Sequence, residues 1–244
     1  MLRQLSPLAL ALALPLFAQD APPAPPADLW TSSIGAGLAL TSGNTDTRNV
    51  NVSFNTVWDP KTDRLFKADA VYLTASSDGE TQVDKATANT RFERMFEERA
   101  FWFGEVQYLR DPLKEISYLI SPLAGAGIHL IRDERRTLTV DGAAGGIFEE
   151  NESFGRETSG AIKAGESFEW RLSEVSSFTQ RLSGLWKVDD LSDALYHFDA
   201  GITTTIVSRL DLKVSLVYDY RSRTPSPDVK NGDSALFAAL VFKF

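Results

Sequence analysis

The sequence has no cysteine among its 244 residues and only two histidines. The absence of cysteine excludes a disulfide framework and metal sites built on thiolates. Basic residues are also the minority, with 25 Lys and Arg against 33 Asp and Glu, so the formal net charge is −8. Nucleic-acid-binding proteins need a basic surface, and nucleic acid is therefore not expected as a partner. Long hydrophobic runs are missing too, since none in the body of the chain approaches the roughly 20 residues that a membrane-spanning helix needs.

One short apolar run lies at the N-terminus and has the features of a targeting segment. Arg3 provides the positive start, residues 8–16 form the apolar core, and Ala18 ends a small-residue cleavage site. We therefore expect a signal peptide over residues 1–18, with an uncleaved anchor helix as the alternative. Residues 19–29 are rich in proline, which favours an extended periplasmic tether that does not join a sheet.

From residue 30 onward, apolar and polar residues alternate, with turn signals at regular spacing. Val50, Val52 and Phe54 share one face of a predicted strand, while asparagine and serine occupy the other face. Twelve strands are expected, over residues 30–41, 48–58, 64–75, 86–96, 100–109, 117–131, 137–148, 157–170, 175–186, 195–206, 212–220 and 233–244. Twelve is an even number, and most connections alternate between short and long, as in membrane barrels. The sequence thus predicts an all-β protein, a 12-stranded antiparallel up-and-down transmembrane barrel over residues 30–244.

The aromatic residues are sorted by strand end, which favours a membrane barrel over the alternative of a soluble β-sandwich. Membrane barrels carry aromatic girdles at both interfaces. With both termini on the periplasmic side, the tryptophans of the predicted inner girdle are Trp30, Trp58, Trp102 and Trp170. The tyrosines of the predicted outer girdle are Tyr72, Tyr108, Tyr196 and Tyr218.

The last strand is apolar and ends on an aromatic residue. Phe242 and Phe244 share an uncharged face with Leu240. The strand resembles the closing strand of bacterial outer-membrane barrels, which the barrel-assembly machinery reads. This resemblance implies that Phe242 and Phe244 form an assembly signal, and that outer-membrane lipid and lipopolysaccharide surround the barrel. The strand is also expected to pair with the first, because lipid does not tolerate an open sheet edge.

Several charged residues lie at mid-strand on the parity that faces the barrel interior. They are Asp69, Arg91, Glu105, Asp141, Lys163, Arg181 and Asp199. Opposed residues of a symmetric hairpin are equidistant from the turn centre. Arg91 is therefore expected opposite both Asp69 and Glu105, Asp141 opposite Lys163, and Arg181 opposite Asp199. Such ion pairs stabilise a sheet and would constrict the lumen; a generally polar interior without specific pairs is the alternative.

Neither a catalytic site nor a cofactor or metal site is expected. His129 and His197 have inward parity, away from any lipid substrate of a Ser–His enzyme. The acidic residues at 149–152 and 189–193 lack the spacing of a Ca²⁺ loop, and we expect them to be solvated. Glu166 would face lipid unless Gly165 marks a bulge that shifts the register.

The stretch Gly35-Ala-Gly-Leu-Ala-Leu-Thr-Ser-Gly-Asn-Thr-Asp-Thr47 resembles a family of Gram-negative outer-membrane proteins. These are described as salt-induced outer-membrane proteins, domain of unknown function 481. Gly125-Ala-Gly127 and the phenylalanine-rich last strand fit the resemblance, which covers about residues 30–244. It implies a β-barrel in the outer membrane and carries over no catalytic residue.

Two functions from different classes follow from these observations. The first is an outer-membrane barrel of structural or envelope-stress type, with a charge-bridged, constricted lumen and no catalytic site. The alternative is a small-solute, porin-like channel, if the inward charges line a water-filled path. A lipid-modifying enzyme is a distant third, because it would need an outward-facing Ser–His pair. The sequence leaves the oligomeric state open.

Overall fold

The computed structural model describes residues 29–41, 47–153, 155–224 and 231–244. The predicted signal peptide, and the predicted tether up to residue 28, lie outside the described residues. Among the described residues, no helix is long and apolar enough to cross a membrane.

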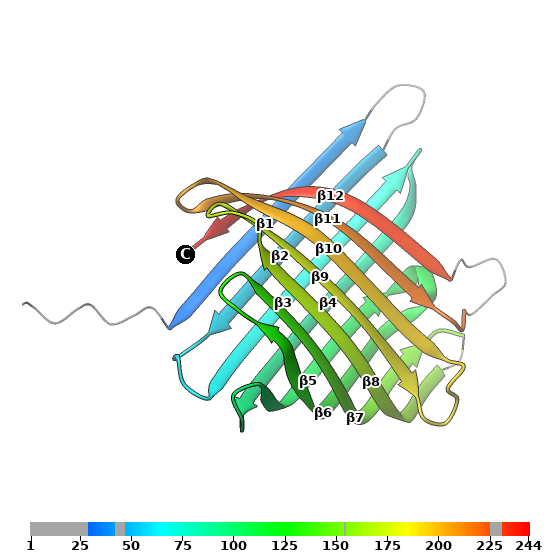
Figure 1. The fold of residues 1–244 in the computed structure, drawn as a ribbon. Helices are drawn as coiled ribbons and strands as arrows, with labels where there is room; N and C mark the ends of the chain where they lie inside the picture. The colour runs from blue at the N-terminus through cyan, green and yellow to red at the C-terminus, as the bar shows by residue number, and fades with distance from the viewer. Residues whose placement is uncertain (1–28, 42–46, 154, 225–230) are drawn as a thin grey trace, which may run out of the picture.

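Twelve antiparallel strands close into one barrel, in which each strand pairs with its neighbours in sequence and the last pairs with the first (Figure 1). The strands are β1 (Trp30–Thr41), β2 (Thr47–Trp58), β3 (Arg64–Ser77), β4 (Glu80–Met95), β5 (Ala100–Asp111), β6 (Ile116–Arg132), β7 (Arg136–Asn151), β8 (Gly155–Arg171), β9 (Ser176–Lys187), β10 (Ala194–Val207), β11 (Leu210–Arg221) and β12 (Gly232–Lys243). A short 3₁₀ helix, η1 (Pro112–Lys114), lies between β5 and β6. The predicted fold is confirmed. We call the end of the barrel where β1 begins and the chain ends the inner end, and the opposite end the outer end.

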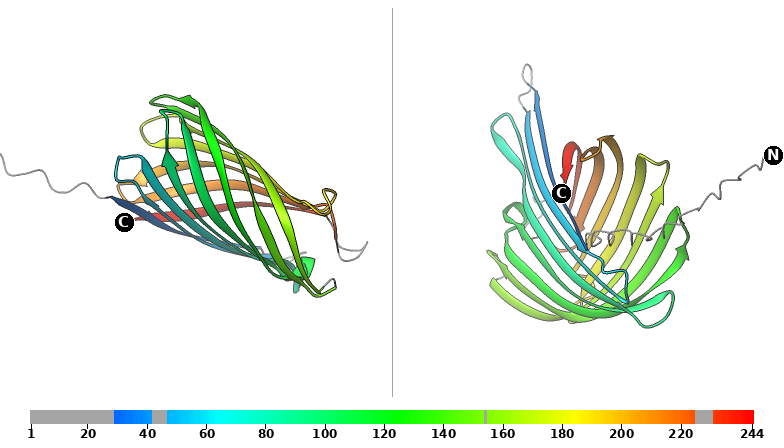
Figure 2. Two further views of the ribbon diagram at one scale, coloured as in Figure 1. Left: turned by 90° about the horizontal axis from the view of Figure 1, so that it is seen from below. Right: turned by 90° about the vertical axis from the view of Figure 1, so that its left-hand side faces the viewer.

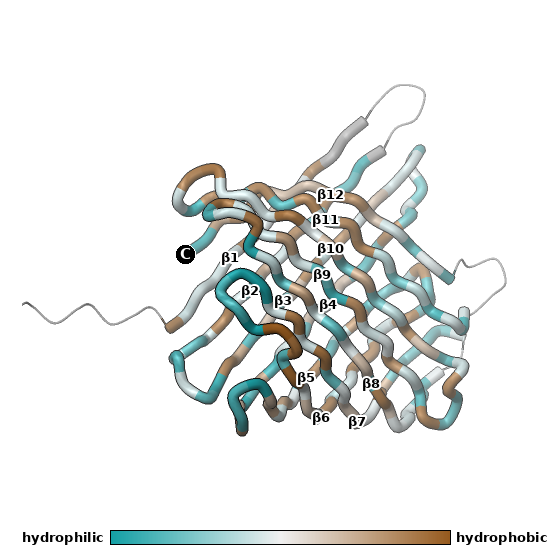
Figure 3. The backbone as a smooth tube through the Cα atoms, in the orientation of Figure 1, coloured by the Kyte–Doolittle hydropathy of each residue, from teal (hydrophilic) through white to brown (hydrophobic). Residues whose placement is uncertain are grey.

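The outer surface of the barrel is apolar. Hydrophobic and hydrophilic residues alternate along the strands (Figure 3), and the hydrophobic ones that face outward are exposed. Leu38 is 64% exposed and Leu236 is 72% exposed, as are many Leu, Ile, Val and Phe side chains on the other strands. A water-soluble monomer rarely exposes so large a contiguous apolar surface. A closed wall of hydrogen-bonded strands with this surface is the form in which β-sheets span a membrane.

The aromatic side chains of the predicted girdles lie near the two ends of the strands. The exposed ones are Trp30, Trp102 and Trp170 in the inner halves and Tyr72, Tyr196 and Tyr218 in the outer halves. Trp58 and Tyr108 are half-buried at the corresponding levels. Trp30 and Trp58 face each other in register, with ring centroids 6.4 Å apart. Their contact with lipid headgroups stays a prediction.

The β3–β4 connection differs from the predicted loop over residues 76–85. Both strands extend further and meet in a two-residue turn, in which Asp78 and Gly79 both have positive φ. Asp-Gly is a favoured sequence for such a tight hairpin turn. An irregularity between Ala75 and Ser76 then shifts the register, so Asp69 lies opposite Asn89. The predicted pairing of Asp69 with Arg91 is wrong for this reason.

The β7–β8 hairpin also has a different centre. Asn151 pairs with Gly155, so Asp141 lies opposite Gly165 instead of Lys163. The ladder is regular through Gly165 on both sides, which excludes the bulge considered for that residue. Glu166 therefore faces outward at mid-strand, where its Oε2 accepts a hydrogen bond of 3.1 Å from Nε2 of Gln180 on β9.

The seam that closes the barrel is short. Within the described residues, β1 and β12 pair in register over four residue pairs, from Ser33 with Lys243 to Ala36 with Leu240. Backbone hydrogen bonds between Ser32 and Phe244 extend this seam at the inner end. The two strands lie side by side there and diverge toward their outer ends (Figures 1 and 2). The predicted pairing of the last strand with the first is thus present and limited to the inner half.

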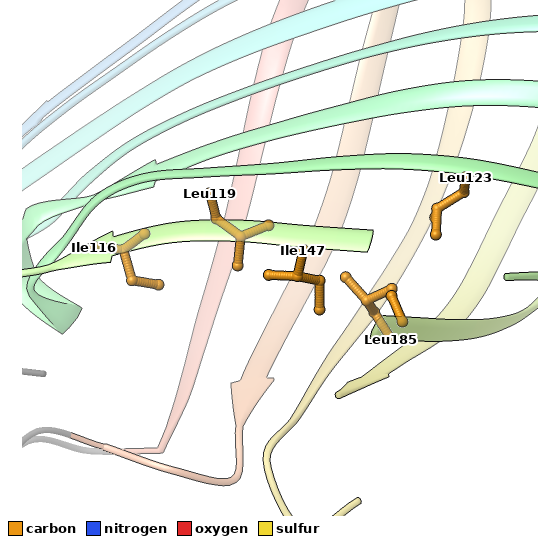
Figure 4. Close-up of a cluster of buried hydrophobic side chains, with 6 residues drawn as sticks. Ile116, Leu119, Leu123, Ile147 and Leu185 are labelled. Atoms are coloured by element: carbon orange, nitrogen blue, oxygen red, sulfur yellow. The ribbon is translucent and has the colours of Figure 1, made fainter. Parts of the chain in front are cut away.

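Part of the barrel interior is apolar. Ile116, Leu119 and Leu123 on β6 point toward Ile147 on β7 and Leu185 on β9 (Figure 4). All five side chains are buried, and they line the wall from β6 to β9 on the inside. This cluster packs that part of the lumen with apolar side chains.

Candidate functional site: a charged lumen

The centre of the lumen holds a set of ion pairs that we call the central cluster. Its members come from β3, β4, β5, β7 and β8 and are Lys67, Arg91, Glu93, Glu105, Asp141 and Lys163. Arg91 is the hub: its Nε lies 2.8 Å from Glu93 Oε1, its Nη1 lies 3.0 Å from Glu105 Oε2, and its Nη2 lies 3.0 Å from Asp141 Oδ2. Lys163 Nζ contacts the other oxygen of Glu105.

All members of the central cluster except Lys67 have buried or nearly buried side chains, so the loss of one partner would leave another charge without compensation. The Glu105 side chain is 1% exposed, and an unpaired carboxylate at such a site would be costly. The Arg91 guanidinium also lies 3.6 Å above the ring of Phe103, a cation–π contact that holds it in place. Gly127 makes room for the neighbouring Phe101, because a Cβ at this position would lie 2.4 Å from the Phe101 ring.

Four of the residues predicted to face inward, Arg91, Glu105, Asp141 and Lys163, meet in the central cluster, but only one of their predicted pairs forms. Arg91 lies opposite Glu105 and bonds it, in the predicted register. Asp141 and Lys163 do not pair with each other; they bond Arg91 and Glu105. These partners come from strands that are not neighbours in the barrel wall. Hairpin symmetry cannot predict such contacts, since they depend on how far the opposite walls stand apart.

Arg181 and Asp199 lie directly opposite each other on β9 and β10, in the predicted register. They form no ion pair in the part of the chain that the structure describes. Asp69 likewise forms no ion pair among the described residues, although its carboxylate is close enough to Arg181 to interact with it electrostatically. These three residues are thus less constrained than the central cluster.

A second set of ion pairs, the outer cluster, occupies the outer end of the lumen. It consists of Glu149, Glu157, Lys187, Asp193 and Arg221, with the more exposed Arg223 at its edge. Lys187 Nζ lies 3.0 Å from Glu149, 2.8 Å from Glu157 and 2.8 Å from Asp193. Arg221 Nη2 on β11 reaches Glu149 on β7 at 2.7 Å, across the three strands between them. The side chains of Glu149, Lys187, Asp193 and Arg221 are all 5% exposed or less.

The outer cluster corrects the expectation that the acidic residues at 149–152 and 189–193 are all solvated. Glu150 and Asp190 are partly or fully exposed, whereas Glu149 and Asp193 are buried against cations. One signal in the sequence could have identified Glu149: it has inward parity at the end of a strand, as does Lys187 on β9. Within the described ranges, no group of acidic and histidine side chains is arranged to hold a metal ion.

Two further ion pairs connect walls that are far apart around the barrel. Lys85 on β4 lies 2.6 Å from Asp219 on β11, and Lys114 of η1 lies 2.7 Å from Asp233 on β12. Lys114 also donates a hydrogen bond to the carbonyl oxygen of Asn231. Both links cross the outer half of the lumen, and the contacts of Lys114 join η1 to the opposite wall at β12.

The two histidines both lie inside the barrel. His129 hydrogen-bonds Thr139, and His197 Nδ1 lies 2.7 Å from Asp219 Oδ1. Ser183 is opposite His197 in register, but no hydrogen bond joins the two side chains among the described residues. A lipid-modifying enzyme needs its nucleophile and base on the lipid side, and this row of residues faces the lumen.

A cavity of about 410 Å³ lies inside the barrel, and its lining extends from Glu169 in the inner half to Arg221 at the outer end. Its lining includes members of the central cluster, the Lys85–Asp219 pair, and the Asp69, Arg181 and His197 side chains. Arg221 of the outer cluster and Lys114 of η1 line it as well. The lumen is therefore neither fully packed nor an open tube through the described part of the barrel.

Residues 34–244 match the family described as "Protein of unknown function, DUF481". The chain belongs to this DUF481 family. The resemblance noted at Gly35–Thr47 is thereby confirmed. No curated protein matches the sequence.

The solved structures that share the fold of this DUF481 protein include two with a TM-score above 0.5. The COG4313 outer membrane channel from Pseudomonas putida F1 is 14% identical, with a TM-score of 0.53 over 91% of this chain and 100% of that chain. The NanC porin is 6% identical, with a TM-score of 0.52 over 87% of this chain and 98% of the other. At these identities the similarity concerns the fold alone, which is that of outer-membrane barrels. Together with the apolar outer surface, it places the DUF481 barrel in the outer membrane of a Gram-negative-type cell.

Proposed function

We propose that this protein is an outer-membrane barrel of structural or envelope-stress type, whose lumen is held closed at its outer end by the outer cluster. The observation that supports this function best is the burial of four charged side chains, Glu149, Lys187, Asp193 and Arg221, inside the mouth of the barrel. Water in an open pore would solvate such groups, so their burial indicates a packed mouth. The links of Lys85 and Lys114 across the lumen support the same conclusion.

The proposal includes the surroundings of the barrel. Outer-membrane lipid and lipopolysaccharide would contact the apolar outer surface and its aromatic girdles. The barrel-assembly machinery would bind the last strand through Phe242 and Phe244, which point outward and are exposed. No catalytic step is part of this function.

A small-solute channel is the second candidate. The cavity of about 410 Å³ favours it, because the volume is within the range of sites that hold small molecules. Two proteins named as an outer membrane channel and a porin share the fold. In this case the outer cluster would act as a gate on a path that the central cluster narrows.

Single-channel conductance of the refolded mature chain in a planar bilayer tests these two functions. The informative variant replaces Glu149, Lys187, Asp193 and Arg221 together by alanine, which removes two charges of each sign and leaves the cluster's net charge unchanged. The matched control replaces Asp59 and Lys61, an exposed pair in the β2–β3 turn, by alanine. We expect no current from the parent and the control, and steady current from the outer-cluster variant.

Steady, salt-proportional current from the parent would overturn the closed-lumen function and favour the channel. Silence from the outer-cluster variant, if it folds, would show that the outer cluster does not close the barrel. Folding of each variant is checked by the heat-dependent shift in electrophoretic mobility that intact membrane barrels show.

A further inference from the structure

One cation that lines the cavity has no carboxylate partner in the part of the chain that the structure describes. Arg181 on β9 lines the cavity and has an exposed side chain, but it forms no ion pair among these residues. The other lysines and arginines of the lining each hold a carboxylate, and they are Lys67, Lys85, Arg91, Lys114, Lys163 and Arg221. A guanidinium left in this state has its planar set of N–H donors available for a ligand.

On the wall opposite Arg181 lies Asp69, an acid that also has no ion-pair partner among the described residues. Asp69 lies on β3, half a turn around the barrel from β9, and lines the same cavity. It forms no ion pair among the described residues, and it is near enough to Arg181 for the two charges to attract each other. Arg181 and Asp69 thus line the same cavity from opposite walls, and no ion pair joins them.

The other acids near Arg181 do not change this arrangement. Asp199 is opposite Arg181 on the neighbouring strand, but it forms no ion pair with it and does not line the cavity. Asp219 is already held by Lys85 and His197. Asp111 and Glu169 line the cavity without an ion pair, near the outer end of β5 and the inner end of β8, and Glu166, which also borders it, has its side chain on the outward parity. Asp69 is thus the acid that faces Arg181 across the middle of the cavity.

A ligand with a single charge would fit this cavity poorly. An anion bound to Arg181 would face the carboxylate of Asp69, and a cation bound to Asp69 would face the guanidinium of Arg181. A solute that carries both charges at its two ends would satisfy both residues. Polar neighbours are present at each end: Ser167 lies opposite Arg181 in register, and Asn89 lies opposite Asp69.

We propose that the lumen contains a binding site for a small zwitterionic solute, with the carboxylate of the solute on Arg181 and its ammonium group on Asp69. The cavity volume of about 410 Å³ suits a solute of this size. The site goes beyond the proposed function, since a solute can bind in the cavity whether or not it crosses the membrane.

Isothermal titration of the refolded mature chain in detergent micelles tests the proposal. The probes are the ω-amino carboxylates glycine, 4-aminobutyrate and 6-aminohexanoate, which differ in the spacing of their two charges. Butyrate and butylammonium serve as matched probes that carry one charge each. We expect at least one of the ω-amino carboxylates to bind, with both single-charge probes about tenfold weaker or more, because each lacks one charge-assisted contact.

Substitutions then assign the two ends of the site. Arg181→Gln and Asp69→Asn should each weaken binding of the zwitterion by about tenfold, the loss expected for one charge-assisted hydrogen bond. The double exchange Arg181→Asp with Asp69→Arg should restore binding, because it reverses the site without removing either charge. Arg156→Gln serves as the control, since Arg156 is exposed at the outer end of β8 and is paired with Glu150.

The proposal is overturned if none of the three ω-amino carboxylates binds to the folded parent. It is equally overturned if butyrate binds as tightly as the zwitterion, or if Asp69→Asn leaves binding unchanged. Circular dichroism and heat-dependent mobility establish that each variant is folded. A folded double-exchange variant that fails to bind, beside a parent that binds, also contradicts the site.

Discussion

Nη2 of Arg91 on β4 donates a hydrogen bond of 3.0 Å to Oδ2 of Asp141 on β7, two strands beyond its nearest neighbour in the wall. The same guanidinium bonds Glu93 and Glu105. One cation therefore connects carboxylates of three strands, and the walls are held together through the lumen as well as along the sheet.

Replacing Arg91 by methionine should be strongly destabilising. The change leaves the buried carboxylate of Glu105 with Lys163 as its one remaining ion-pair partner, and removing one member of a buried pair costs about 3–5 kcal/mol. The measurement is the free energy of unfolding in urea, with the barrel in lipid vesicles. Arg64→Met is the control, because its contact with Asp63 is exposed and weak pairs of this type contribute about 1 kcal/mol or less. Equal losses for the two variants would contradict a structural role for the hub.

Gly125 on β6 should not tolerate a side chain. A Cβ there would lie 2.1 Å from the carbonyl oxygen of Gly142 on β7, and backbone atoms in a ladder cannot move aside easily. We expect Gly125→Ala to lower the refolded fraction markedly, as read from heat-dependent mobility on gels. Gly104→Ala is the matched control on β5, since no atom lies within 4 Å of its added Cβ. A normal yield from Gly125→Ala would show that the β6–β7 contact is wider than described.

Removing the carboxyl group from the lipid-facing surface should stabilise the barrel. Glu166 faces outward beside Gln180, and a charged side chain at the bilayer midplane is unfavourable by up to about 2–4 kcal/mol, with less for acids. The double variant Glu166→Leu with Gln180→Leu removes both polar groups and should raise the free energy of unfolding by about 1–2 kcal/mol in vesicles. Glu169→Leu, on the inward parity of the same strand, should give no such gain. A loss of stability in the double variant would indicate that another molecule uses the polar pair.

Substitution of Phe244 tests whether its ring is needed for assembly in the cell and not for the stability of the folded barrel. Backbone atoms of Phe244 hydrogen-bond Ser32, and alanine would keep these bonds while losing the ring. If the assembly machinery reads the aromatic ring, Phe244→Ala should reduce the amount of barrel in the outer membrane of cells and leave refolding in vitro unchanged. Phe178→Ala, an outward aromatic at the inner end of β9, is the control. Equal amounts of barrel from Phe244→Ala and the parent in cells would argue against such a signal.

The sequence predicted the parts of this fold that depend on neighbouring strands. Alternation from residue 30 onward indicated the strand number and the inward parity of Arg91 and Glu105. The contacts of Asp141 and Lys163 were out of reach, because they cross the lumen and depend on the cross-section of the barrel. The turn at Asp78-Gly79 could have been predicted, because this dipeptide is a recognised signal for a two-residue hairpin turn. The loop expected over residues 76–85 is longer than this turn.

The short seam between β1 and β12 determines where the wall is weakest. Among the described residues, four residue pairs close the barrel there, whereas each of the other ladders joins ten pairs or more. Local opening is easiest where the fewest hydrogen bonds must break together. The pairing of β1 with β12 ends at Ala36 and Leu240, and this is the point at which the two strands separate most easily. A fluctuation that brings a lipid chain into the interior, or lets a nascent barrel widen during insertion, would begin at that point and spread toward Ser32 and Phe244.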